Sequence, residues 1–252
     1  FPGPAEGIEG AGFSANGRQV LIRGKDLQAQ LWDRESGQPL QSFRGHEWKI
    51  ADFDLASDGR LATASWDASL RVWEPASGRE LARLYLPDDG AFFRVRFSAD
   101  GQRLLAGEEH NSAKIWDLRD GRVTSLRGIA GGVFHVRWLA DDRLALTASA
   151  DGDVRVWDAD DGRPLAVVAA VGGPVPIVRI DPAQRWLATT SRQDEQVGIW
   201  SLALERRTPE TVAALLRCRS PWILGDEALE ARRPPREDCR IDTHPKVTGA
   251  AP

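Results

Sequence analysis

The chain has 252 residues, enough for one or two domains that each bury a full hydrophobic core. Its net charge is −4 and no block of Lys or Arg stands out, so the composition supports neither a nucleic-acid partner nor an anionic membrane surface. No apolar run approaches the roughly 18 residues that a membrane span needs.

The number and position of the cysteines bear on the cellular compartment of the protein. The two cysteines, Cys218 and Cys239, both lie near the C-terminal end. A disulfide-stapled secreted domain is therefore not expected, and we predict a cytoplasmic location. The chain starts with Phe1 and contains no Met, so we expect it to be a piece of a longer polypeptide.

Short segments of alternating polarity, separated by turns rich in Gly, Asp, Asn and Ser, predict an all-β fold from residue 5 to residue 202. They group into five successive units, 5–44, 45–84, 85–128, 129–169 and 170–202. In the first two units we expect strands at 8–13, 18–23, 29–33, 39–43, 50–55, 60–65, 70–74 and 80–84. Pro39 has no N–H to donate, so we expect its strand at the outer edge of a sheet.

The next three units continue this pattern, and the fifth one is shorter. We expect strands at 92–97, 103–107, 113–117, 122–126, 133–139, 143–149, 154–158, 164–168, 175–180, 186–190 and 197–201. The pattern is lost where the fourth strand of the fifth unit would come. We expect a closing strand or further sheets from a preceding part of the protein or from another chain, unless 202–207 supplies the strand.

A tryptophan recurs at one place in every unit, with spacings of 41, 43, 41 and 43 residues. These residues are Trp32, Trp73, Trp116, Trp157 and Trp200. Four short strands in a unit of about 40 residues resemble the WD40 β-propeller family. The resemblance implies five four-stranded blades that cover one another's faces. Because WD40 rings most often have more blades, we expect these five to belong to a larger, seven-bladed ring, with a closed ring of five as the alternative.

The composition changes after Ser201. Thr208-Pro209-Glu210 is typical of a helix start, so we expect a short helical and irregular tail over 203–252. The tail resembles the Cys-containing segment that follows propellers in large multidomain bacterial signalling proteins. Cys218, Cys239 and His244 are too few for a closed zinc site, and we expect buried thiols, with a local disulfide as the alternative.

Four residues of the second unit suggest a catalytic set at first: His46, Ser65, Asp67 and Trp73. Their spacing resembles the structural tetrad of WD40 blades. That resemblance implies a hydrogen-bond chain that links the third strand to the loop before the first. Because Trp is no catalytic partner and parts of the pattern recur in other units, we favour a structural role over a nucleophile.

The third unit has Glu108, Glu109 and His110 where Ser and Asp belong. Consecutive residues of a tight turn point in different directions, so we do not expect them to bind a metal ion together. The chain also lacks a phosphate-binding Gly-rich loop and a nucleophile elbow. We therefore expect no catalytic residues, no metal and no cofactor.

By analogy with the family, two positions of each unit face a partner: the beginning of the first strand and the residue before the turn Asp. Carried across the units, these are Glu9, Ala51, Phe93, Phe134 and Pro176, with Lys25, Trp66, Glu109, Ala150 and Gln193. Exposed aromatic residues beside a cation are typical of interface hot spots, which predicts a binding face. Its members are Trp48, Lys49, Trp66, Phe93, Phe134 and Glu109. The alternative is that Phe93 and Phe134 fill a gap between blades.

These observations favour a non-catalytic module that recognises another protein, as the sensor of a multidomain bacterial signalling or defence protein. The alternative is an architectural scaffold that holds domains or subunits in place. A propeller enzyme would need polar groups that converge on the central channel, and we expect the first strands to offer mostly small or apolar residues there.

Overall fold

The computed structural model describes residues 7–14, 16–85, 90–170, 173–175, 177–190, 197–202, 222–224 and 229–231. The chain divides into two compact units, Phe1–Leu202 and Ala203–Pro252. The described part of the second unit is an antiparallel pair, β20 (Trp222–Leu224) and β21 (Leu229–Ala231). The helix expected after Thr208 and the residues Cys218, Cys239 and His244 lie outside the described part.

The first unit consists of five antiparallel sheets, and each sheet contains consecutive strands of the chain. The first two sheets contain β1 (Ile8–Phe13), β2 (Gln19–Gly24), β3 (Ala29–Asp33), β4 (Pro39–Phe43), β5 (Ile50–Leu55), β6 (Leu61–Ser65), β7 (Ser69–Trp73) and β8 (Glu80–Tyr85). The third and fourth contain β9 (Phe92–Phe97), β10 (Arg103–Glu108), β11 (Ala113–Asp117), β12 (Val123–Leu126), β13 (Val133–Leu139), β14 (Leu144–Ser149), β15 (Asp153–Asp158) and β16 (Pro164–Ala170). The fifth contains β17 (Ile177–Ile180), β18 (Trp186–Thr190) and β19 (Val197–Ser201). The predicted all-β fold of the repeats is confirmed.

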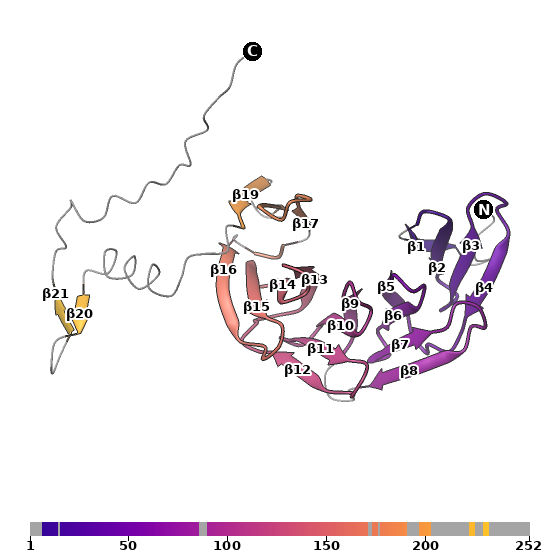
Figure 1. The fold of residues 1–252 in the computed structure, drawn as a ribbon, viewed down its shortest axis with the longest axis horizontal. Helices are drawn as coiled ribbons and strands as arrows, with labels where there is room; N and C mark the ends of the chain where they lie inside the picture. The colour runs from indigo at the N-terminus through magenta and orange to yellow at the C-terminus, as the bar shows by residue number, and fades with distance from the viewer. Residues whose placement is uncertain are drawn as a thin grey trace, which may run out of the picture. The chain divides into compact units, whose positions relative to one another are not determined.

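Within this unit the five sheets stand side by side around an arc (Figure 1). The first strand of each sheet lies on the inner side of the arc, and the fourth strand, where the structure describes one, lies on the outer side. The prediction from Pro39 is confirmed, because β4 is the last strand of its sheet and, among the described strands, pairs with β3.

The hydrophobic core lies between consecutive sheets. Trp73 packs with Leu21 and Phe43 of the sheet before it. In the same way Trp116 packs with residues of the second sheet, and Trp157 with residues of the third. Each of these tryptophans is almost completely buried. A single sheet would leave its tryptophan in water, so the repeats stabilise one another by stacking.

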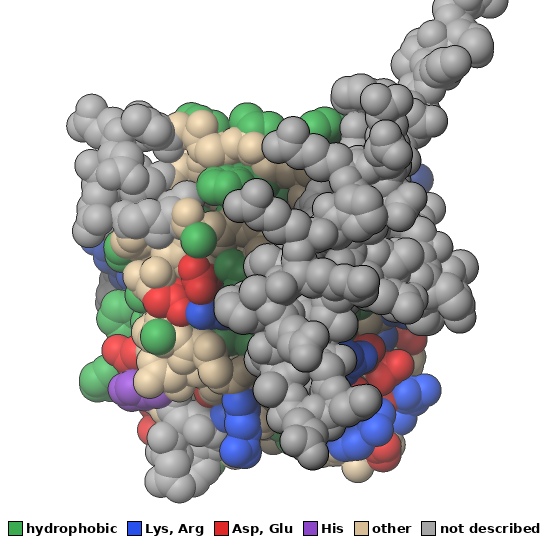
Figure 2. Space-filling model, turned by 90° about the vertical axis from the view of Figure 1, so that its left-hand side faces the viewer, with side chains coloured by type: hydrophobic (Ala, Val, Ile, Leu, Met, Phe, Trp, Pro, Cys, Tyr) green, Lys and Arg blue, Asp and Glu red, His purple; other side chains and the backbone are tan. Residues whose placement is uncertain are grey.

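The fifth sheet differs from the others because only three of its strands lie in the described part of the chain. Its strands carry apolar side chains that face solvent, among them Val197 and Ile199, which are 65% and 64% exposed. Figure 2 shows a side of the molecule on which hydrophobic side chains reach the surface between acidic and basic ones. In the described residues, no helix has the length and apolarity to cross a bilayer.

Candidate functional site

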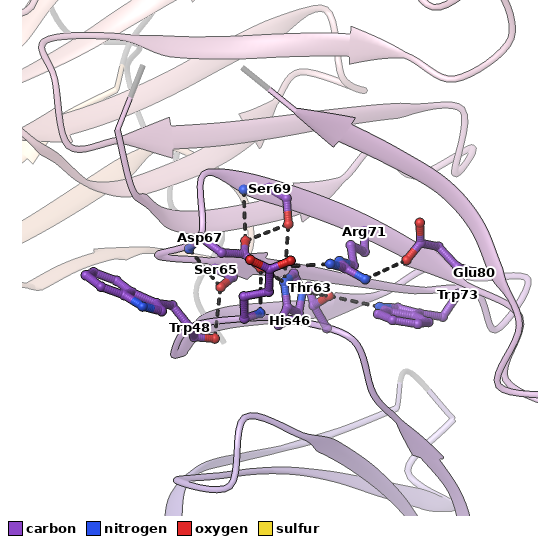
Figure 3. Close-up of polar contacts among 10 residues, drawn as sticks. His46, Trp48, Thr63, Ser65, Asp67, Ser69, Arg71, Trp73 and Glu80 are labelled. Carbon is purple, nitrogen blue, oxygen red and sulfur yellow. Dashed lines mark hydrogen bonds and ion pairs between the residues drawn. The ribbon is translucent and has the colours of Figure 1, made fainter. Parts of the chain in front are cut away.

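The second sheet contains a buried chain of side-chain hydrogen bonds (Figure 3). The His46 ring lies before β5, with its Nδ1 2.9 Å from Asp67 Oδ2 and its Nε2 2.7 Å from Thr63 Oγ1. The indole N–H of Trp73 donates to the same threonine oxygen at 2.9 Å. These hydrogen bonds therefore connect the turn before β7, the loop before β5 and the end of β7, and they give buried polar groups their partners.

Ser65 was expected to supply the hydroxyl between His46 and Trp73 in this hydrogen-bond chain, but Thr63 supplies it. Trp73 pairs with Leu61 across the sheet, and Thr63 is the next residue of β6 on the same side. Ser65 is four residues beyond Leu61, about 13 Å along the strand, and so lies out of reach of the indole. Its hydroxyl instead donates to the Trp48 carbonyl at 3.1 Å and accepts from the Asp67 amide at 3.1 Å.

A repeated threonine could have revealed this role from the sequence. Thr63 precedes Trp73 by ten residues, and Thr147 precedes Trp157 by the same number. In the fifth sheet the indole N–H of Trp200 bonds to the hydroxyl of Thr189, eleven residues earlier. Both additional bonds are 2.9 Å long. The indole–threonine bond is thus shared by three sheets, whereas the buried histidine belongs to the second alone among the described residues.

The Asp67 carboxylate organises the loop before β5. It accepts hydrogen bonds from the Glu47 amide at 3.0 Å and the Ser69 hydroxyl at 2.6 Å, besides its contact with His46. Burial alone would raise the pKa of the Asp67 carboxyl. The hydrogen bonds from His46 and Ser69 outweigh burial and hold this pKa well below its usual range.

Acid should weaken the fold in part through Asp67. Its folded-state pKa lies below the unfolded value of about 3.9, so the stability that ionised Asp67 contributes is present above that value and is lost as pH falls toward the folded pKa. We expect Asp67→Asn to lower the free energy of unfolding more at pH 5 than at pH 3. Urea unfolding at both pH values measures this difference. Asp160→Asn is the control, because the side chain of Asp160 is 81% exposed; an equal loss at both pH values for Asp67→Asn would contradict the expectation.

The third sheet has a buried ion pair in place of this hydrogen-bond chain. Glu108 is fully buried, and the ammonium of Lys114 lies 3.0 Å from its carboxylate. The Ser112 hydroxyl donates to the same carboxylate at 2.5 Å. Glu109 and His110 are exposed, which separates them from Glu108. Nowhere in the described residues do three His, Cys, Asp or Glu side chains gather as a metal ion would require.

The fourth sheet keeps much of the arrangement with a different cation. The Asp151 carboxylate accepts from Ser149 at 2.6 Å and from the Arg155 guanidinium at 2.8 Å. Burial opposes ionisation of Asp151, but these two partners hold the pKa of its carboxyl below the usual value. Arg155 therefore occupies the place beside Asp151 that His46 occupies beside Asp67.

The predicted binding residues gather at one end of the sheets. We name Trp48, Lys49, Trp66, Phe93, Phe134 and Glu109 the Trp66 face. In four sheets the amide of the residue before the turn donates to a carbonyl just before or at the beginning of the first strand, at 2.9 to 3.1 Å. The donors are Lys25, Trp66, Glu109 and Ala150, and the acceptors are Gly7, Lys49, Ala91 and Gly132. Equivalent residues of successive sheets therefore occupy the same end. Pro176 and Gln193 lie outside the described residues.

The second sheet gives the Trp66 face two exposed indoles. Trp48 is 63% exposed and Trp66 is 42% exposed. The Lys49 ammonium lies 5.3 Å from the centre of the Trp66 ring and 2.8 Å from the Glu9 carboxylate. The Trp48 indole points away from the buried hydrogen-bond chain (Figure 3). This cluster combines apolar area with a cation held in place by two contacts.

Phe93 and Phe134 stack on one another across two sheets. Their ring centres are 5.6 Å apart and the ring planes differ by 18°. Both side chains are half-buried. The pair fills space between β9 and β13 and still presents area to solvent, so features of both sequence-based alternatives are present.

The inner side of the arc differs from the sequence expectation. Small or apolar residues were expected there, and that expectation was wrong. A cavity of about 260 Å³ is lined by five arginines, namely Arg23, Arg94, Arg96, Arg137 and Arg179. Arginines alternate with apolar residues along β9, so the apolar residues enter the core between sheets while the long arginine side chains turn inward.

Comparison with known proteins shows which family the repeats resemble. The profile of the family "WD domain, G-beta repeat" matches residues 37–74, 84–117 and 121–158. A guanine nucleotide-binding protein subunit beta of Schizosaccharomyces pombe is 42% identical over 62 residues, which are 24% of this chain and 20% of that protein. The subunit beta-5b of Danio rerio is 27% identical over 169 residues, covering 48% of this chain and 42% of that protein.

A third relative is the nuclear distribution protein PAC1 of Arthroderma otae. It is 30% identical over 115 residues, which cover 41% of this chain and 25% of that protein. The chain thus spans less than half the length of each of these three relatives. Each matched segment contains the first three strands of the second, third or fourth sheet and ends one residue after the tryptophan of that sheet. Each also includes all or part of the last strand of the sheet before it. The matched segments are therefore WD40 repeats, and the five antiparallel sheets have the all-β architecture of WD40 propeller blades.

Proposed function

We propose that this chain is a non-catalytic protein-interaction module that docks a partner protein through the Trp66 face. The observation that carries the proposal is the exposure of Trp48 and Trp66 around the fixed Lys49 ammonium. Large exposed indoles next to a cation supply contact area at low cost in conformational entropy. The relatives support the general role, because a protein named as a subunit works in an assembly with other chains.

More specifically, we propose that this interaction module is the sensor of a larger signalling or defence protein. The Trp66 face suits ligand recognition because its side chains lie at the ends of strands that the sheets hold rigidly. The bacterial context and the cytoplasmic location remain predictions, and the relatives described above come from eukaryotes.

An architectural scaffold is the second candidate, and the fifth blade favours it. Val197 and Ile199 expose apolar area on β19, and Trp186 of β18 is exposed as well. In a propeller, such a face is covered by the next blade. We propose that further blades, from the same protein or from another chain, cover this face and complete a larger ring.

Truncation of Trp66 distinguishes the two candidates. If the Trp66 face binds a partner, Trp66→Ala should weaken capture of that partner by roughly 30-fold, equivalent to about 2 kcal/mol, with an unchanged melting temperature. Quantitative pull-down with immobilised chain measures the loss, and Phe93→Ala tests the neighbouring pair. Trp186→Ala is the comparison variant, because its exposed indole belongs to the fifth blade and not to the Trp66 face.

Each outcome of the pull-down has a distinct meaning. Equal capture by the wild type, Trp66→Ala and Trp186→Ala would contradict docking through the Trp66 face. Loss of assembly in Trp186→Ala, measured as a smaller particle by light scattering, with unchanged capture by Trp66→Ala, would favour the scaffold.

A further inference from the structure

The arginine cavity on the inner side of the arc collects charge from across the propeller. Arg23 comes from the first blade, Arg94 and Arg96 from the third, Arg137 from the fourth and Arg179 from the fifth. The cavity lining contains one carboxylate, Asp52. The whole chain carries a net charge of −4, so this positive site is a local feature of the fold and does not reflect a generally basic protein.

The contacts of these arginines leave most of the positive charge uncompensated. Arg96 Nη1 lies 2.6 Å from Asp52 Oδ2, which accounts for the carboxylate in the lining. Arg94 and Arg179 donate one N–H each to a neutral backbone carbonyl, at 2.7 Å and 2.9 Å. Arg137 forms neither a hydrogen bond nor an ion pair with the residues that the structure describes. Several guanidinium N–H groups therefore remain available to a ligand.

The first blade adds a further cation. Arg23 Nη1 lies 2.6 Å from the Ile50 carbonyl and 3.4 Å from the Glu9 carboxylate, which also binds Lys49. One carboxylate is thus shared between two cations at this edge of the cavity. Burial lowers the pKa of Arg94, and the nearby charges of Arg96 and Arg23 lower it further, although Asp52 acts in the opposite direction. The fold therefore holds like charges together, an arrangement that an anion would stabilise.

We propose that this cavity binds a small oligophosphate, a ligand with two or more linked phosphate groups. Planar guanidinium groups match phosphate oxygens in bidentate pairs. A volume of about 260 Å³ is below the roughly 300–1,000 Å³ of sites for drug-sized ligands, which favours a compact anion. A single carboxylate would neutralise one charge, whereas linked phosphates reach arginines of several blades at once. None of the residues of the Trp66 face lines the cavity, so the proposal is independent of partner docking.

Isothermal titration calorimetry of the full chain with inorganic pyrophosphate tests the proposal. We expect saturable binding with one site per chain, at least tenfold tighter than the binding of inorganic phosphate. Arg137→Gln and Arg179→Gln should each weaken pyrophosphate binding at least tenfold with unchanged melting temperatures, because both side chains are exposed and Arg137 has no described partner. Arg163→Gln, at an exposed arginine outside the cavity, should bind as the wild type does.

Four results would overturn the proposal. The first is no pyrophosphate binding at millimolar concentration. The second is an equal loss in Arg163→Gln and Arg137→Gln, which would mean general charge attraction. The third is equally tight binding of phosphate or of the dicarboxylate succinate, which would remove the preference for linked phosphates. Titration with tripolyphosphate extends the series, and weaker binding than that of inorganic phosphate would also count against the proposal.

Discussion

Replacing Lys114 with methionine is expected to lower the free energy of unfolding by about 3–5 kcal/mol. Methionine fills a similar volume, but Glu108 would remain fully buried without the ammonium that lies 3.0 Å from it. The loss arises because a buried carboxylate that loses its ion-pair partner is strongly destabilising. Equilibrium urea unfolding followed by tryptophan fluorescence measures the difference.

The double substitution Glu108→Leu with Lys114→Met separates the charge effect from packing. Removal of both charges should recover most of the stability, because a buried ion pair and an apolar pair of similar volume are often close in energy. Lys25→Met is the matched control at an exposed lysine, with an expected change within about 0.5 kcal/mol. A loss below 1 kcal/mol for Lys114→Met would show that water or another group compensates Glu108.

Thr63→Val should lower the free energy of unfolding by about 2–4 kcal/mol, with little change in side-chain shape. The valine would deprive two buried groups, the His46 ring and the Trp73 indole N–H, of the oxygen that they share. Each buried polar group left unpaired costs about 1–3 kcal/mol. Thermal and urea unfolding of the purified variant would measure the loss.

Ser65→Ala provides the comparison for Thr63→Val. Ser65 is buried as well, but its hydroxyl bonds only to backbone groups of Trp48 and Asp67 and links no buried side chains, so the expected loss is about 1 kcal/mol. A larger loss for Ser65→Ala than for Thr63→Val would assign the central hydroxyl to Ser65 after all.

The strands of the propeller could be predicted closely from the sequence because local rules determine them. Turn residues end each strand, alternation fixes the buried face, and Pro39 identifies an outer strand. The recurring tryptophans carry the resemblance that implied stacking, and in the structure Trp73, Trp116 and Trp157 lie between neighbouring sheets. These inferences needed no information on how distant residues meet.

The sequence-based predictions that were wrong concern features that depend on distances between strands and between blades. The choice between Thr63 and Ser65 depends on the register of β6 against β7, in which a shift of two residues moves a hydroxyl out of reach of Trp73. The arginines of the cavity come from four blades, and each of them alone looks like an ordinary polar residue of a half-buried strand. Only the arc brings their guanidinium groups to one place.

The residue before each turn is held by its main chain, whatever side chain it carries. Lys25, Trp66, Glu109 and Ala150 make the same amide-to-carbonyl bond, yet they display a cation, an indole, a carboxylate and a methyl group. Folding therefore imposes almost no requirement on chemistry at these positions. Mutation can rewrite them one by one while the scaffold stays intact, which would let new specificities evolve, or be engineered, with little loss of solubility or expression.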